Sequence, residues 1–77
     1  MKIELIKWID AVSEAGWTNN PNPPTTNVTV GFVVYEDDDF VQVATTWCPD
    51  SGIWNASMSI PRCFINSQET IKEYETE

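Results

Sequence analysis

Hydrophobic and polar residues alternate along the middle of the chain in the way that is typical of antiparallel strands. From residue 28 to residue 60 the sequence reads VTVGFVVY, EDDD, FVQVATTW, a turn, and WNASMSIP. β-Branched and aromatic residues favour strands, and the segments between them are rich in turn-forming residues. The pattern predicts three consecutive antiparallel strands over residues 28–36, 40–47 and 53–60.

The first residues, KIELIKWI at positions 2–9, fit two structures. Ile3 and Leu5 alternate with charged residues, as in a strand, whereas Ile3 and Ile6 also have helical spacing, and Gly16 would end such a helix. We expect a strand through about Ile9, because the other strands need a β partner. An irregular or bulged turn over residues 10–16 would follow it.

The C-terminal part is predicted to leave the sheet. Pro61 ends the strand before it, and residues 62–65 fit either a short 3₁₀ turn or a fifth strand. Asn66 or Ser67 could then cap a short helix with the sequence SQETIKEY, and residues 75–77 would fray.

Turn chemistry defines the remaining segments. Residues 18–27, TNNPNPPTTN, form a predicted loop because proline lacks an N–H donor and asparagine favours turns. Residues 36–39 make an acidic hairpin turn, and Gly31 predicts a bend or bulge within its strand. The whole chain, residues 1–77, is thus predicted to be one mainly β domain. We expect a small antiparallel barrel or bent sheet of four or five strands, SH3-like or Sm-like, with a short C-terminal helix.

Charge excludes several classes of function. The 77 residues include twelve acidic and four basic side chains and no histidine, for a net charge of −8. Nucleic-acid binding and anionic membranes both require clusters of lysine and arginine, so neither is expected as a direct partner. The surplus of carboxylates instead favours solubility, a basic partner, or mimicry of an acidic ligand.

Catalysis and metal binding are not expected. Without histidine no Ser-His or Cys-His pair can form, and no glycine-rich phosphate loop exists among three glycines. The four acids at 36–39 lack the spacing of a calcium loop, and two cysteines without histidine do not favour a zinc site. We therefore expect a protein that is not an enzyme and that holds no cofactor.

The cysteines and the start of the chain bear on the compartment. MKIELIKWID lacks the apolar stretch of a signal peptide, and no apolar run reaches the ~20 residues that span a bilayer. We expect a cytoplasmic protein with reduced cysteines. Cys48 and Cys63 follow successive strands, so a disulfide between them stays an open alternative.

Aromatic residues supply the candidate binding groups. Four tryptophans are more than a small core needs, and Trp17 and Trp54, which lie beside loops, are the ones that we expect to be exposed. Arg62, the only arginine, could hold a phosphate or carboxylate, although an internal ion pair is the simpler expectation. Asp10, which could pair with an acid of the hairpin turn, completes the set of candidate binding residues.

The chain also resembles a group of natural proteins. The segment WIDAVSEAGW at 8–17 fits the pattern W-x-D-A-x-S-x-x-G-W, and it is followed by VGFVVYEDDDFVQVA at 30–44 and SIPR at 59–62. In these motifs the chain is similar to small uncharacterised proteins encoded by tailed bacteriophages. The resemblance implies a viral protein in the cytoplasm of a host bacterium, and it brings no assigned chemistry.

Three hypotheses about function follow. The first is a non-enzymatic protein that binds a host bacterial protein and inhibits or redirects it. The second is a sponge for a small nucleotide signal of host immunity, with Trp17 or Trp54 stacking a base and Arg62 holding a phosphate. The third is an acidic mimic of DNA. Because a chain of this size has a small core, we also expect a homo-oligomer, a dimer or higher.

Overall fold

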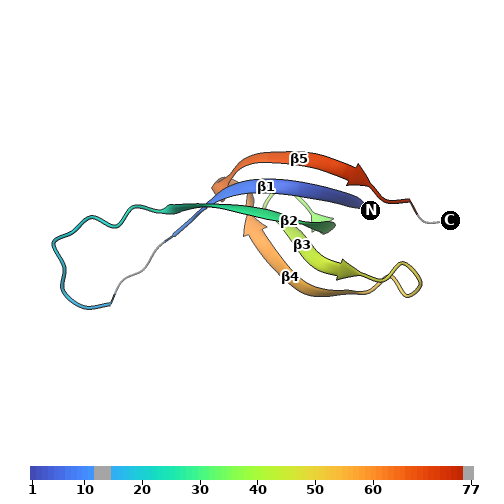
Figure 1. Cartoon of the computed structure of the whole chain (residues 1–77), viewed down its shortest axis with the longest axis horizontal. Coiled ribbons are helices and arrows are strands. Elements are labelled where there is room, and N and C mark those ends of the chain that lie inside the picture. The colour runs from blue at the N-terminus through green and yellow to red at the C-terminus, as the bar shows by residue number, and fades with distance from the viewer. Residues whose placement is uncertain (12–14, 76–77) are drawn as a thin grey trace.

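Five strands form one antiparallel sheet in the computed structural model of the chain, which describes residues 1–11 and 15–75 (Figure 1). The strands are β1 (Lys2–Asp10), β2 (Thr25–Glu36), β3 (Phe40–Trp47), β4 (Trp54–Pro61) and β5 (Ile65–Glu73). Their order across the sheet is β4-β3-β2-β1-β5, and every neighbouring pair is antiparallel. The sheet is strongly bent and not closed, so β4 and β5 are its two edges. This architecture confirms the predicted mainly β fold.

The strands at the centre of the sheet follow the hydrophobic alternation. The strand predicted at the start of the chain is β1, and β3 has the predicted bounds. β2 begins earlier than predicted because Thr25, Thr26 and Asn27 pair with the last residues of β1, from Asp10 back to Trp8. The Pro/Asn-rich loop is correspondingly shorter at its end, and residues 12–14 of the predicted turn lie outside the described residues.

The predicted C-terminal helix is wrong, because these residues form β5. The short turn η1 (Arg62–Phe64) is a 3₁₀ helix, one of the two structures expected there, and it leads directly into β5. β5 pairs with β1 from Lys2 to Trp8. A helix of about eight residues gains little stability by itself. Pairing with β1 instead satisfies backbone groups that would otherwise line an open edge.

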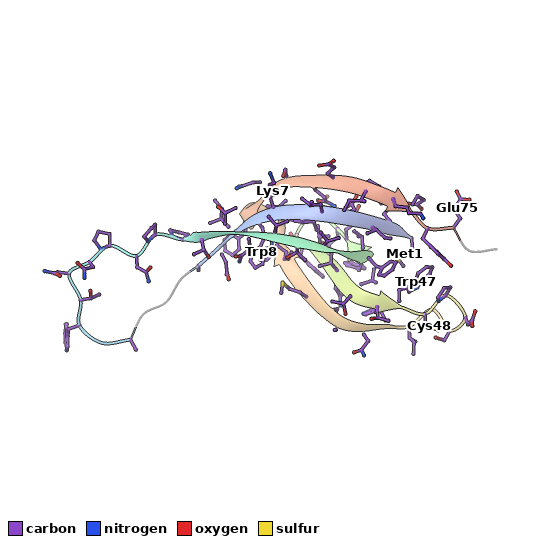
Figure 2. The ribbon with its side chains drawn as sticks, viewed as in Figure 1. Met1, Lys7, Trp8, Trp47, Cys48 and Glu75 are labelled. Carbon is purple, nitrogen blue, oxygen red and sulfur yellow. The ribbon has the colours of Figure 1, made fainter. Side chains whose placement is uncertain are left out.

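The hydrophobic core lies on one face of the bent sheet. Alternate residues of β1 face it, and they include Ile6, which is completely buried, and Trp8, whose indole Nε1 donates a 2.9 Å hydrogen bond to Thr29 Oγ1. The other core residues are Val33, Val41, Val43 and Ile60. The sheet curves so that Met1, Trp47 and Cys48 lie at one end, whereas Trp8 lies toward the other (Figure 2).

Gly31 has a structural role that differs from the predicted bend. β1 and β2 pair without a shift through Gly31, and the irregularity of β2 falls between Val33 and Tyr35, against β3. A Cβ atom at Gly31 would lie 2.8 Å from the carbonyl oxygen of Ala44. Glycine is therefore required because β3 approaches the backbone closely, and the bulge lies further along the strand.

Candidate binding site

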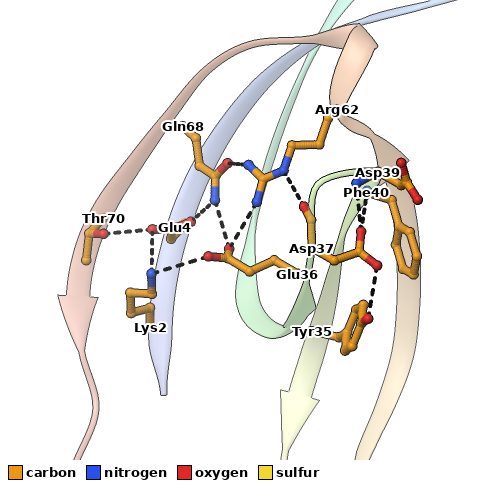
Figure 3. Close-up of polar contacts among 10 residues, drawn as sticks. All are labelled: Lys2, Glu4, Tyr35, Glu36, Asp37, Asp39, Phe40, Arg62, Gln68 and Thr70. Carbon is orange, nitrogen blue, oxygen red and sulfur yellow. Dashed lines mark hydrogen bonds and ion pairs between the residues drawn. The ribbon is translucent and has the colours of Figure 1, made fainter.

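Arg62 is held by a network of polar groups inside the bend of the sheet (Figure 3). Its Nε donates a 2.7 Å hydrogen bond to the carbonyl oxygen of Asp37, and its Nη1 donates one of 3.1 Å to Gln68 Oε1. Its Nη2 lies 3.9 Å from Glu36 Oε2. The guanidinium thus joins the turn after β2 to β5, and two of its five N–H donors make hydrogen bonds within the chain.

Glu4 is the buried acid of this network. Its side chain is 5% exposed, and it accepts hydrogen bonds from Gln68 Nε2 and, at 2.7 Å, from Thr70 Oγ1. Lys2 Nζ lies 4.0 Å from Glu4 Oε2 and 3.8 Å from Glu36 Oε1. A buried carboxylate is tolerable only with such partners, so the network fixes β5 against β1.

The network contains half of the basic side chains, so the rest of the surface is more acidic in proportion than the whole chain. It contains two of the four basic side chains, Lys2 and Arg62, and two of the twelve carboxylates, Glu4 and Glu36. The rest of the chain therefore carries ten carboxylates against two lysines, Lys7 and Lys72. The electrostatic field that a partner meets is strongly negative, and it attracts basic surfaces.

The acidic turn between β2 and β3 is organised by Asp37. Its Oδ1 accepts hydrogen bonds from the backbone N–H groups of Asp39 (2.8 Å) and Phe40 (3.0 Å), and its Oδ2 accepts one from the Tyr35 hydroxyl (2.9 Å). The N–H of Phe40 and then that of Asp39 lower the pKa of Asp37, whereas the bond to Asp37 raises the pKa of Tyr35. Within the described residues no group of three acids or thiols is arranged to hold a metal ion. The turn is a hairpin connection built on an aspartate side chain.

Residues 15–24, which precede β2, form a segment that projects from the sheet (Figure 1). These residues are all exposed, and the longest dimension of the molecule, 57 Å against 21 and 20 Å, reflects this projection. Trp17 lies on it with a relative exposure of 106%. Asp10 lies where the segment leaves the sheet, and its Oδ2 is 3.5 Å from Asn27 Nδ2. An indole that contacts so little of its own chain can be buried only by another molecule.

Aromatic side chains line a shallow hollow at the end of the sheet where β1 begins and β5 ends. The hollow has a volume of about 190 Å³, and its lining comprises Phe32, Trp47, Pro49 and Tyr74. The Trp47 ring centre lies 5.9 Å from that of Phe32 and 5.8 Å from that of Tyr74, the latter edge to face. No basic side chain lines it, so it offers an apolar contact and no partner for a phosphate.

A second hollow lies beside Trp54, at the tip of the β3–β4 hairpin. It has a volume of about 130 Å³ and is lined by Thr46, Cys48, Ile53, Trp54 and Asn55. The hydroxyl of Ser51, followed by backbone N–H groups of the turn, lowers the pKa of the Cys48 thiol. Cys48 and Cys63 are both free and exposed, and they lie at opposite ends of β4.

The four candidate binding residues do not form one cluster within the chain. Trp17 and Trp54 are exposed as expected, but Trp17 lies on the projecting segment and Trp54 at the start of β4. Arg62 follows the other end of β4 and makes the internal contacts that were the simpler expectation. Asp10 lies at the base of the projecting segment. The roles of all four in binding stay predictions.

The sequence did not indicate that Glu4, Gln68 and Thr70 belong to the polar network around Arg62. The alternation of β1 has apolar residues on both faces, so the burial of Glu4 on the same face as Ile6 and Trp8 is not apparent from it. Gln68 and Thr70 were assigned to a helix, which hid their period-2 spacing on a strand. The available signal was that Glu4 precedes Ile6 and Trp8 at the period-2 spacing of one strand face.

Comparison of the chain with protein-family models, with curated proteins and with solved structures finds no match. Among the described residues no helix has the length and apolar character needed to cross a membrane. The function must therefore be argued from the arrangement of these residues.

Proposed function

We propose that the chain is a non-enzymatic binding protein that docks onto a protein partner through the projecting segment, with Trp17 as the anchor. In the bacteriophage setting that the resemblance implies, the partner would be a host bacterial protein that is inhibited or redirected. The observation that carries the proposal is the complete exposure of Trp17 on a segment that stands away from the sheet. Tryptophan is among the residues that contribute most when buried at the centre of an interface.

Charge supports a partner with a basic surface. Asp10 lies at the base of the same segment, and the surface outside the polar network carries ten carboxylates against two lysines. A negative field of this kind accelerates association with a basic partner and opposes contact with other acidic surfaces. The sheet then acts as a rigid support for the segment.

The experiment compares wild-type protein with the Trp17→Ala variant as baits in a bacterial lysate. We expect the wild-type bait to recover one protein in near-stoichiometric amount and the Trp17→Ala bait to lose it. With that protein purified, calorimetry should show an affinity at least tenfold weaker for the variant, because a central tryptophan is worth roughly 2 kcal/mol or more.

Trp54→Ala is the matched control. It removes another exposed indole, 43% exposed, from the hairpin tip, and the affinity for the same partner should change little. Both variants should keep the far-ultraviolet circular dichroism spectrum of the wild type. Equal recovery of the partner by the wild-type and Trp17→Ala baits would refute the proposal.

The other two hypotheses predict different results. A nucleotide sponge would show a raised melting temperature with cyclic or linear nucleotides and no protein partner. Two of the five N–H donors of Arg62 already make hydrogen bonds within the chain, which leaves fewer of them for a phosphate. A DNA mimic would be displaced from its partner by duplex DNA.

A further inference from the structure

The β3–β4 hairpin differs from the rest of the molecule in charge. Asp50, in the turn, is the only charged residue among residues 40–61, although the whole chain has sixteen acidic and basic residues. Three large apolar side chains of the hairpin are nevertheless exposed: Ile53 (66%), Trp54 (43%) and Met58 (47%). In a chain with a net charge of −8, this is the surface on which a second copy would meet least repulsion.

The hairpin also provides an open edge of the sheet. β4 pairs with β3 on one side, and no other strand of the described chain pairs with its other side. Natural edge strands are commonly protected by charged side chains. β5, the opposite edge, carries Glu69, Lys72 and Glu73, whereas the sequence of β4, WNASMSIP, has no charged residue. Only β4 lacks this protection.

We propose that two copies of the chain associate through β4, edge to edge and antiparallel, to form one continuous sheet about a two-fold axis. Ala56 has a positive φ of 55°, so the extended part of the edge is the segment from Ser57 to Pro61. Pairing of this segment with itself is centred on Ser59, which lies opposite Ser59 of the second copy. A two-fold axis perpendicular to the sheet keeps the core-facing sides of both copies on the same side.

Met58 supplies the apolar contact of this interface. It pairs with Val43, which is buried, and it therefore faces the core side of the sheet at the exposed edge. In the proposed pairing Met58 lies opposite Ile60 of the second copy. The two Met58 side chains thus extend the hydrophobic cores toward each other, which adds burial that one small core lacks.

The test places charges on the two-fold axis. Ser59 is exposed, so Ser59→Glu and Ser59→Lys should leave the fold of one chain intact. Light scattering should give twice the 8.7 kDa of one chain for the wild type at high micromolar concentration. Each variant alone should weaken dimerisation at least tenfold, because directly opposed strand residues have Cβ atoms only about 5 Å apart. An equal mixture of the two variants should restore the dimer, since glutamate then faces lysine.

Control variants show whether a loss of the dimer comes from charge at this interface. The neutral variant Ser59→Gln should remain dimeric, and Ser67→Glu, on the exposed side of β5, should leave the dimer unchanged. Trp17→Ala should also leave it unchanged, because the proposed partner site lies elsewhere. A wild-type mass of one chain at millimolar concentration would overturn the inference. So would a mixture of the Ser59 variants that stays monomeric.

Discussion

Individual side chains in this protein make hydrogen bonds that connect residues apart from the pairing of the strands. Asp37 is the clearest case, since one carboxylate accepts hydrogen bonds from two backbone N–H groups and from the Tyr35 hydroxyl. Trp8 combines a buried ring with an indole N–H that donates to Thr29 across the β1–β2 pair. The Trp8 contact satisfies a polar group at the core, whereas the Asp37 contacts order an exposed turn.

The Asp37 contacts predict a pH-dependent stability. The pKa of Asp37 lies below its ordinary value of 3.8, first because of the Phe40 N–H and then because of the Asp39 N–H. The stabilisation is therefore complete above the ordinary pKa and is lost as pH falls through the lowered pKa of the folded state. Asp37→Ala should lower the melting temperature at neutral pH, and its difference from the wild type should shrink in strong acid. Asp38→Ala, in the same turn, should lower the melting temperature less, because the hydrogen bonds of Asp37 stay in place; thermal unfolding followed by circular dichroism across this range measures both variants.

At the scale of the elements, strand pairing decides what local propensity leaves open. The alternation and the turn residues were sufficient to predict β2 to β4, because these strands carry β-branched and aromatic residues between clear turns. The pattern of β1 also fitted a helix, and the strand was expected there because the other strands need a β partner. They failed for β5, where SQETIKEY has a helical composition and a capping residue. What decides the structure of that segment is the free edge of β1 and the buried Glu4, and neither is visible from nearby sequence. The exposure of Trp17 and Trp54 was predictable from their places beside loops, but that they lie apart, between β1 and β2 and at the start of β4, was not.

Gly31 gives a prediction at the same scale. Gly31→Ala would place a Cβ atom 2.8 Å from the Ala44 carbonyl oxygen, so β2 and β3 would have to separate. We expect a loss of about 1–3 kcal/mol in the free energy of unfolding, as for other overpacked interiors. Urea denaturation measures it. Val30→Ala, one residue away at a position that is 52% exposed, should cost clearly less; equal losses in both variants would contradict the close approach as the cause.

On the scale of the whole molecule, charge divides the protein into three regions. The polar network around Glu4 and Arg62 is balanced, and it joins β1 and β5 to the turn after β2. The β3–β4 hairpin is nearly uncharged, and the remaining surface is strongly acidic. This division links the two proposals, because an acidic surface suits a basic partner, whereas an uncharged edge permits contact with a second acidic copy.

Removal of one negative charge from the polar network and of one from the acidic surface should therefore change the free energy of unfolding in opposite directions. Glu4→Gln and Glu69→Gln each take one negative charge from a chain of net charge −8, which by itself relieves repulsion. Glu69 is exposed, so its variant should be as stable as the wild type or slightly more stable. At position 4, however, an amide NH₂ group would face the donors of Gln68, Thr70 or Lys2, and one donor at this buried side chain would lose its acceptor. We expect Glu4→Gln to lower the free energy of unfolding by about 1–3 kcal/mol, measured by urea denaturation at neutral pH. If both variants were equally stabilised, net repulsion would dominate, and the network could not be what holds β5 against β1.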